Sequence, residues 1–296
     1  MDLKKYLKEK KEMVDKALEG YLPMEEEDFD IITKAMRYSL FAGGKRVRPI
    51  LCIAGAEAVG GMKGQILPVA CALELIHTYS LIHDDLPALD NDDYRRGVPT
   101  SHKVFGEAIA ILAGDALLTE AFKLMSHPDV RKGINSERLL EVIHIVSYAA
   151  GYHGMVRGQV ADLLSEDKEV HTDTVEYIHM HKTGALITAS VLSGGILGGG
   201  SETEIASLKS YGQKVGLAFQ IADDLLDVEG QSHIMGKEAG SDIKSKKATY
   251  VAVIGLNESR EMARHFISLA LDAISSFDHR ADPLRAIAHY IIERKY

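Results

Sequence analysis

QILPVACALELIHTYSLIHDDLPALDNDD, residues 65–93, is the stretch that decides the fold of this 296-residue chain. Its first part, residues 65–82, is apolar on nearly every side, as is typical of a helix inside a bundle rather than on its surface. A second such run covers residues 215–226 and also leads into clustered aspartates. Elsewhere apolar residues recur at intervals of three and four, the period of an α-helix, and almost nothing reads as strand.

These patterns predict an all-α fold, a single-domain bundle of roughly ten helices over residues 1–296. The chain shows no repeat of fixed period and no Pro- or Ser-rich linker between domains. Residues 201–204 and 173–176 have the Ser/Asp-x-x-Glu pattern of capped helix starts. Residues 183–200 carry no charge, but they are short for a membrane span of ~20 residues. They predict a buried helix with a Gly-rich exit.

Composition excludes several classes of protein. Apolar residues make up 46% of the chain, charged residues 26%, and there are only 7 Pro, so neither a disordered nor a fibrous protein fits. Lys and Arg total 34 against 43 Asp and Glu, a net charge of −9. That sign opposes nucleic-acid binding and stable membrane insertion, and we expect neither.

Cys52 and Cys71 match no zinc or redox spacing and predict buried thiols. The charged N-terminus lacks a secretory pattern, which predicts a cytoplasmic location.

The first acidic cluster follows the apolar run directly and places five carboxylates within residues 84–93. A solvated acidic turn is the simplest interpretation of such a run. However, these carboxylates emerge from a helix that is expected to be buried. Pro87 removes a backbone donor and bends the chain between Asp84 and Asp90. This bend could direct both carboxylates at one cation.

The second acidic cluster contains Gln220, Asp223, Asp224 and Asp227, spaced so that several share one helical face. Groups with only oxygen ligands suit hard cations. Mg²⁺ in particular tends to take one or two carboxylates and to complete its shell with phosphate oxygens and water. The two clusters together predict magnesium bound with a phosphate-bearing ligand.

Basic residues stand where a polyphosphate would need them, in the segment GGKRVR at residues 43–48 and around the two clusters. Arg grips phosphate with a planar fork and Lys acts as a point charge, so the combination favours diphosphates. The candidate cations are Lys45, Arg46, Arg48, Arg95, Arg96, Lys182, Lys237 and Lys247.

The order of these motifs resembles that of the trans-prenyltransferases, the short-chain isoprenyl diphosphate synthases. The motifs are GGKRVRP, HTYSLIHDDLPALDNDDYRRG, KTG, FQIADDLLD, GK and KATY, and they extend over residues 37–250. Within the family, the pattern is most similar to bacterial farnesyl diphosphate synthases (geranyltranstransferases). The resemblance implies an isoprenoid-synthase bundle around a deep central cavity, a homodimer, and three Mg²⁺ ions at the cavity mouth.

The resemblance also implies a role for each matched residue. The metal ligands are Asp84, Asp90 and Asp223, with Asp85, Asp224 and Asp227 as supporting carboxylates. The isopentenyl diphosphate site contains Lys45, Arg48, His77 and Arg96. The allylic diphosphate is held by Arg95, Lys182 and Lys237, with Lys247 near it. Thr183 and Gln220 face the allylic carbon that becomes cationic.

The implied reaction is a Mg²⁺-dependent head-to-tail (1′-4) condensation of isopentenyl diphosphate with dimethylallyl or geranyl diphosphate. It proceeds by ionisation, condensation and loss of a proton. Product length depends on what closes the cavity behind Asp84. Bulky Tyr79 followed by small Ser80 resembles the farnesyl pattern and predicts a C15 product. Geranylgeranyl or geranyl diphosphate is the alternative within the family.

Other functions compete with this interpretation. Glu-x-x-His pairs could hold a di-iron centre in a ferritin-like bundle, but a di-iron centre leaves both Asp clusters unused. A class I terpene cyclase needs only one Asp-rich helix, and a non-catalytic prenyltransferase subunit tends to lose aspartates that are intact here. Gln159 and Asp162 either form structural hydrogen bonds or lie near the substrate. The Glu-x-x-His pairs are Glu74/His77, Glu141/His144 and Glu176/His179.

Overall fold

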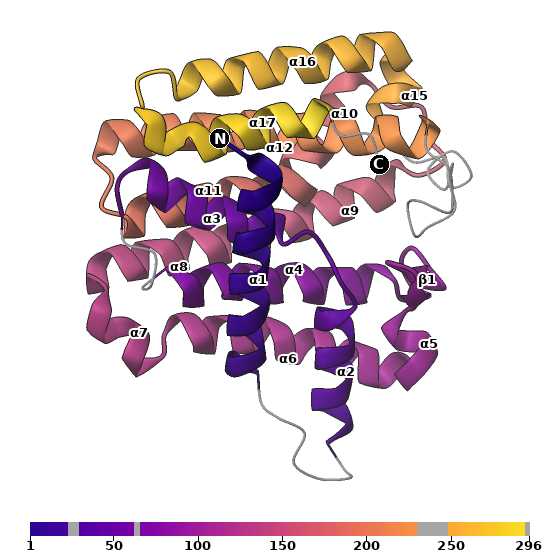
Figure 1. Cartoon of the computed structure of the whole chain (residues 1–296). Coiled ribbons are helices and arrows are strands. Elements are labelled where there is room, and N and C mark those ends of the chain that lie inside the picture. Colours follow the sequence, from indigo (N-terminus) through magenta and orange to yellow (C-terminus); the bar gives the residue numbers. More distant parts are fainter. Residues whose placement is uncertain (23–29, 62–65, 230–247, 294–296) are drawn as a thin grey trace.

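The computed structural model describes residues 1–22, 30–61, 66–229 and 248–293, and nearly all of their regular structure is helical (Figure 1). The longer helices are α1 (Leu3–Tyr21), α2 (Ile31–Phe41), α3 (Val47–Ala58), α4 (Leu67–Asp84), α6 (Glu107–Met125), α8 (Ser136–Ala150), α9 (Met155–Ser165), α11 (Ala185–Leu197), α12 (Glu202–Glu229), α16 (Leu256–Ala273) and α17 (Asp282–Glu293). The all-α prediction is confirmed.

Short elements connect these helices. They are α5 (Ser101–Phe105), α7 (Pro128–Gly133), α10 (Thr172–His179), α15 (Tyr250–Ile254), the π-helical turn η2 (Met180–Gly184) and the 3₁₀ turn η3 (His279–Ala281). Strands β1 (Tyr94–Arg95) and β2 (Val98–Pro99) form an antiparallel hairpin of two residues each. Sequence periodicity did not predict α5, α7, α15 or the hairpin, because each is too short to show a repeat.

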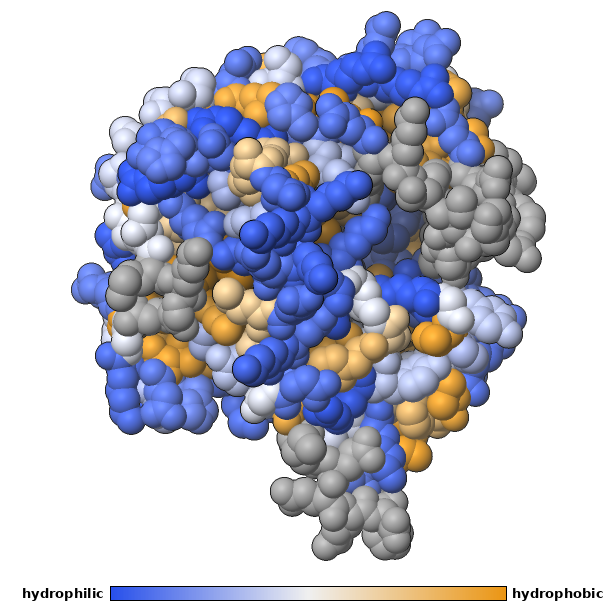
Figure 2. Space-filling view, viewed as in Figure 1, coloured by the Kyte–Doolittle hydropathy of each residue, from blue (hydrophilic) through white to orange (hydrophobic). Residues whose placement is uncertain are grey.

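Most helices run roughly parallel in stacked layers, and α1 and α2 cross them (Figure 1). Helix α1 buries Val14 and Leu18 and turns a largely hydrophilic face outward (Figure 2). In the described part of the chain, no helix combines the length and the apolar character needed to cross a membrane.

Helices α3, α4, α11 and α12 form the centre of the bundle. In α11 every side chain from Leu186 to Ile196 is buried, and the helix ends at Gly198, which confirms the predicted buried helix with a Gly-rich exit. Helix α11 packs on α3 at backbone distance: a Cβ atom on Gly194 would lie 1.8 Å from the Cys52 carbonyl oxygen. Glycine is therefore required at this crossing. Cys52 and Cys71 are buried free thiols, as expected.

The two predicted capping patterns have different outcomes. The Ser201 hydroxyl accepts from the Glu204 N–H at 3.3 Å, and the Glu204 carboxylate accepts from the Ser201 N–H at 2.8 Å. This is the reciprocal capping box that was predicted for α12. The prediction that Asp173 caps α10 is wrong, because the residue at the N-cap is His171 and Asp173 lies in the first turn.

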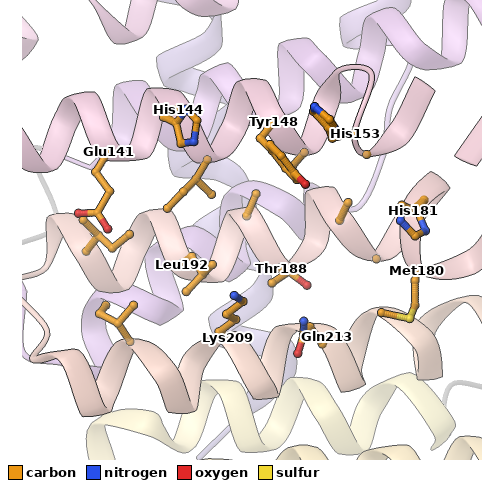
Figure 3. A pocket seen from close by; sticks show the side chains of 18 residues that line it. Glu141, His144, Tyr148, His153, Met180, His181, Thr188, Leu192, Lys209 and Gln213 are labelled. Atoms are coloured by element: carbon orange, nitrogen blue, oxygen red, sulfur yellow. The ribbon is translucent and has the colours of Figure 1, made fainter. Parts of the chain in front are cut away.

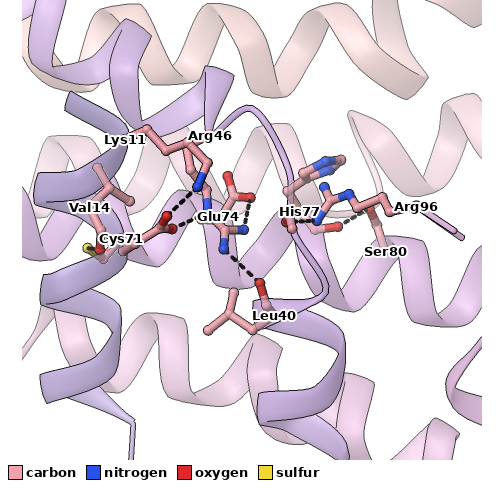
Figure 4. Close-up of polar contacts among 11 residues, drawn as sticks. Lys11, Val14, Leu40, Arg46, Cys71, Glu74, His77, Ser80 and Arg96 are labelled. Carbon is pink, nitrogen blue, oxygen red and sulfur yellow. Dashed lines mark hydrogen bonds and ion pairs between the residues drawn. The ribbon is translucent and has the colours of Figure 1, made fainter. Parts of the chain in front are cut away.

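A buried arginine fixes the segment that leads into α3. Arg46 is only 2% exposed, and its guanidinium donates to the Asp15 carboxylate at 2.7 Å, the Glu74 carboxylate at 2.8 Å and the Leu40 carbonyl at 2.8 Å (Figure 4). These bonds join α1, α2 and α4. The guanidinium of Arg46, which the sequence groups with the phosphate-binding cations, is engaged by these internal partners, although the residue also lines the cavity described below. The neighbouring Lys45 and Arg48 take their positions from this anchor.

Removal of the Arg46 side chain should therefore destabilise the fold. Arg46→Ala leaves the Glu74 carboxylate buried without its counter-charge, which costs about 3–5 kcal/mol in comparable cases. Denaturant unfolding should show this loss. Lys123→Ala, which breaks the exposed pair with Glu120, should change stability by no more than ~1 kcal/mol. Equal effects of the two substitutions would contradict the anchoring role.

Candidate active site

A cavity of about 950 Å³ lies among α3, α4, α9, η2 and α12, and its size suits a small-molecule ligand. It gathers residues from distant parts of the chain, including most of those singled out in the sequence. The predicted site residues on its wall are Lys45, Arg48, His77, Tyr79, Ser80, Asp84, Arg95, Arg96, Lys182, Thr183, Gln220 and Asp223.

Four of the six aspartates that were predicted to bind or support the metal are not on the cavity wall. Asp85, Asp90, Asp224 and Asp227 are not among the lining residues. Lys237 and Lys247 lie outside the described residues, so their predicted roles stay predictions.

The first acidic cluster begins where α4 ends. Asp84 is the last residue of α4, and the Asp90 N–H donates to the Asp84 carbonyl oxygen at 2.8 Å, so the chain after Pro87 folds back on the helix end. Burial raises the pKa of the Asp84 carboxyl; the Lys182 ammonium opposes this shift and the charge of Asp90 adds to it. A cation in the cavity would stabilise the ionised form of Asp84.

Asp85 does not line the cavity. Its carboxylate instead holds the guanidinium of Arg95, which does line it. Asp85 is 3% exposed and accepts a hydrogen bond from the Arg95 guanidinium at 2.6 Å. The same guanidinium contacts Asp92 at 3.2 Å. Arg95 is thus held by two carboxylates while it lines the cavity.

In the second acidic cluster, too, one aspartate lines the cavity and its neighbour in the sequence does not. Asp223 lines the cavity, whereas Asp224 is 2% exposed and accepts from the Tyr250 N–H at 3.0 Å. Asp224 also accepts from the Gln220 side-chain amide at 3.3 Å. Gln220 in turn accepts from the Thr183 hydroxyl at 2.9 Å. Asp224 therefore supports the Gln220–Thr183 pair from behind.

His179 completes the surroundings of Asp224. Its ring Nε2 lies 3.6 Å from the Asp224 carboxylate. Burial, with a smaller contribution from Lys182, lowers the pKa of His179 to about 3, so the ring is neutral at pH 7. A neutral ring cannot serve as the counter-charge of Asp224.

The arrangement of carboxylates suits Mg²⁺ shared with a phosphate ligand. Within the described ranges, no group of three or more His, Cys, Asp or Glu residues could hold a metal alone. Asp84 and Asp223 line one cavity. Because Mg²⁺ uses one or two carboxylates and fills its shell with phosphate oxygens and water, these residues fit such an ion.

The basic residues that line the cavity differ in whether their hydrogen-bond donors have partners within the protein. Burial lowers the pKa of Arg48 to about 10, which leaves it charged at neutral pH, and its Nε atom is buried without a hydrogen-bond partner among the described residues. Arg96 donates to the Gly43 carbonyl oxygen. Burial and the nearby guanidinium groups lower the pKa of His77 well below its usual value. His77 is therefore a neutral polar group beside the charges.

Backbone strain occurs around this cavity. Arg46 (φ 52°), Asn91 (φ 51°) and Arg96 (φ 55°) adopt left-handed conformations without being glycine. Such conformations cost roughly 1–2 kcal/mol each. Strain of this kind persists where surrounding contacts enforce it, often at functional sites. Here it shapes the loops that carry the cations.

Lys182 reaches the cavity from the π-helical turn η2, a feature that is frequent at functional sites. Its ammonium contacts the Asp162 carboxylate at 2.6 Å, so Asp162 orients Lys182. Gln159 lines the cavity, and its Oε1 atom has no partner among the described residues. A Cβ atom on Gly158 would lie 2.1 Å from the backbone nitrogen of Lys182. Nothing in the sequence singled out Gly158, because its role depends on the contact between α9 and η2.

A family model, polyprenyl synthetase, matches residues 29–282. The chain belongs to the polyprenyl synthetase family. It is therefore a prenyltransferase that elongates trans-prenyl diphosphates, and the family is magnesium-dependent.

Similar proteins cover almost the whole of this polyprenyl synthetase. A dimethylallyltranstransferase of Fischerella ambigua is 49% identical over 100% of this chain and 84% of its own length. A geranylgeranyl diphosphate synthase of Cyanophora paradoxa is 48% identical over 98% of this chain and 95% of its own. Several chloroplastic geranylgeranyl pyrophosphate synthases of plants are also similar.

Solved structures share the fold. A geranylgeranyl pyrophosphate synthetase from Pyrococcus horikoshii superposes with a TM-score of 0.90, at 32% identity and over 99% of both chains. A geranyltransferase from Helicobacter pylori, complexed with magnesium and isoprenyl diphosphate, superposes with a TM-score of 0.86, at 30% identity and over 99% of this chain and 97% of that one. The predicted isoprenoid-synthase architecture is confirmed.

Asp84→Asn and Asp223→Asn should each lower kcat by at least about 100-fold, because each removes a charge that faces the cavity. Asp129→Asn on α7, an exposed position, should leave kcat unchanged. Near-normal rates in both cavity variants would contradict the assignment.

Asp84→Asn should also raise the thermal unfolding temperature at neutral pH without Mg²⁺. Because the pKa of Asp84 is raised in the folded state, its ionised form destabilises the fold above that pKa. The gain should shrink as the pH falls and Asp84 becomes protonated. A pH-independent difference would argue against this origin.

Proposed function

We propose that this polyprenyl synthetase condenses isopentenyl diphosphate with allylic diphosphates and releases geranylgeranyl diphosphate as its main product, with Mg²⁺ as cofactor. The observation that carries the proposal is that one aspartate from each Asp cluster, Asp84 and Asp223, lines one cavity together with several basic and apolar side chains. A terpene cyclase would not need the second cluster, and a non-catalytic subunit would not need both intact.

Different residues serve different steps of the proposed reaction. When bound, Mg²⁺ supplies charge neutralisation to the diphosphate leaving group. Arg95 and Lys182 are held by carboxylates and can grip the allylic diphosphate as its C–O bond breaks. The bonding electrons leave with the diphosphate, and the alkene of isopentenyl diphosphate attacks the allylic cation. The oxygen atoms of Thr183 and Gln220 can face that cation. Loss of a proton, accepted by the released diphosphate, restores a double bond.

Apolar side chains exclude water from the cation. Met155 and Leu163 of α9 and Phe219 of α12 line the cavity. A dry wall protects the carbocation from hydrolysis and strengthens the electrostatic interactions around it.

Two observations bear on product length. The similar proteins favour a C20 product, since several of them are geranylgeranyl synthases. Tyr79 instead favours C15: it is 7% exposed, lines the cavity and packs edge-on against the His83 ring at 5.7 Å between centroids. However, Tyr79 is one residue on the α4 side of a cavity that α9 and α12 also line, so it does not by itself decide the product length. We therefore place C20 first and C15 second.

The test is to incubate the protein with isopentenyl diphosphate and geranyl diphosphate, with Mg²⁺ or with EDTA, and to measure product length. We expect C20 as the main product with Mg²⁺ and none with EDTA. Tyr79→Ala should shift the products to longer chains, whereas Tyr290→Ala on α17 should not. A C15 main product would contradict the C20 proposal and support the alternative. No Mg²⁺-dependent condensation would refute the whole proposal.

We also propose that the enzyme is a homodimer, with one domain over residues 1–296 and a cytoplasmic location. Apolar side chains are exposed on α6, α8 and α9 and in the turn between the last two, and patches of this kind often mark interfaces. They are Ile111 (43% exposed), Leu112 (53%), Leu140 (67%), Tyr152 (72%), Val156 (46%), Val160 (49%) and Leu164 (64%).

Light scattering should give twice the chain mass for the wild-type protein. Leu112→Glu, which places a charge on this patch, should shift the protein towards monomer. Ile31→Glu, an exposed apolar position on α2 (45%), should have no such effect. A wild-type monomer would contradict the proposal.

A further inference from the structure

A second groove, of about 540 Å³, lies between α8 and α12 with α11 as its floor (Figure 3). None of its lining residues lines the catalytic cavity. Its volume is in the range of small-molecule sites, which is roughly 300–1,000 Å³. The proposed reaction uses none of the residues in it.

The groove changes character along α11. Figure 3 shows Tyr148, His153 and His181 near the start of α11, with Gln213 of α12 opposite them. Further along, Leu192, Ile196 and Ile205 line the groove on α11 and α12, and Figure 3 shows His144 and Glu141 of α8 on the opposite side. The first part of the groove can therefore form hydrogen bonds, and the α11 and α12 walls of the second part can bury hydrocarbon.

Several polar groups at the first end are unused within the protein. Thr188 is 8% exposed on the groove floor. In the part of the chain that the structure describes, the side chains of Thr188, Gln213 and Lys209 have no hydrogen-bond or ion-pair partner. Tyr148 stacks on His153, with ring centroids 4.7 Å apart and planes at 8°, which fixes both rings on the rim. Converging polar groups of this kind give orientation to a ligand.

The charges of the lining favour an anion. Lys209 is the lysine that lines the groove, and the imidazoles of His144, His153 and His181 can donate hydrogen bonds. Glu141 is the carboxylate of the lining, and Figure 3 shows it at the far end from His153 and His181. A negative head group would therefore be repelled from the Glu141 end of the groove, and Figure 3 shows Lys209 between Leu192 and Gln213, away from that end.

From this polarity and charge we propose that the groove binds a linear amphiphile, a hydrocarbon chain with an anionic head group. The chain lies along Leu192 and Ile196, and the head group contacts Lys209, Gln213 and Thr188. The proposal for this groove holds whether the enzyme makes a C20 or a C15 product.

The groove and the catalytic cavity share one structural element. Met180, His181 and Gly184 of η2 line the groove, whereas Lys182 and Thr183 of the same turn line the cavity. A ligand in the groove therefore packs against the turn that carries two of the proposed catalytic residues.

The first test is calorimetric titration of the full-length protein with dodecyl phosphate, in saturating Mg²⁺ and inorganic pyrophosphate so that the polar part of the catalytic cavity is filled. We expect saturable binding that Lys209→Glu weakens by about tenfold, the scale of one charge-assisted contact. The matched control is Lys214→Glu, whose ammonium lies over the Phe266 ring outside the groove. It should weaken binding by less than about twofold. Absence of binding, or equal effects of the two substitutions, would overturn the proposal.

The second test locates the ligand directly. A dodecyl phosphate with a diazirine near the end of its chain should label peptides that contain Ile145, Leu192 or Ile205. Labelling confined to peptides of the catalytic cavity would overturn the proposal. Dodecyl trimethylammonium has the same chain and a cationic head, and it should bind at least about tenfold more weakly. Equal affinity would show that the head group is not recognised as an anion.

Discussion

Negative charge at the facing sides of α4 and α12 is the constraint on which the site depends. Asp84 and Asp223 both line one cavity, and burial disfavours the ionised form of Asp84. The nearby charge of Asp90 adds to this effect, and a cation beside Asp84 would relieve the repulsion between the two carboxylates. The neighbouring carboxylates avoid this repulsion because each has a fixed partner. The pairs are Asp85 with Arg95, Asp224 with the Tyr250 N–H, and Asp162 with Lys182.

Satisfied and unsatisfied polar groups stand side by side around the cavity. Arg46 makes three hydrogen bonds inside the protein, but two positions later Arg48 has a buried nitrogen without a partner in the described residues. The Oε1 atom of Gln159 is in the same state. Buried polar atoms without partners are uncommon, and a group of them beside a cavity indicates that a ligand completes their hydrogen bonds. The fold thus keeps the anchor rigid and leaves the ligand-facing atoms available.

The helical pattern predicted the buried helices and the composition of the site, whereas the choice of Asp84 and Asp223 over their neighbours as the main ligands came from the family resemblance. Adjacent residues of a helix point about 100° apart, so the pattern alone could not decide that Asp223 and not Asp224 lines the cavity. For the same reason Arg46 was grouped with Lys45 and Arg48, although it turns to Glu74. Gly158 carried no signal because its role depends on a contact between two elements. Product length was predicted from Tyr79 and Ser80, which are two residues of a cavity that α9 and α12 also line.

The central claim is that the carboxylates of this cavity bind diphosphate only through Mg²⁺. Calorimetric titration of the wild-type protein with inorganic pyrophosphate, at a fixed Mg²⁺ concentration and again in EDTA, tests it most directly. We predict tight binding with Mg²⁺ and a loss of at least about 100-fold without it, because the carboxylates then repel the ligand. Pyrophosphate binding of equal strength in EDTA would show that the cations alone hold the diphosphate and would contradict the account.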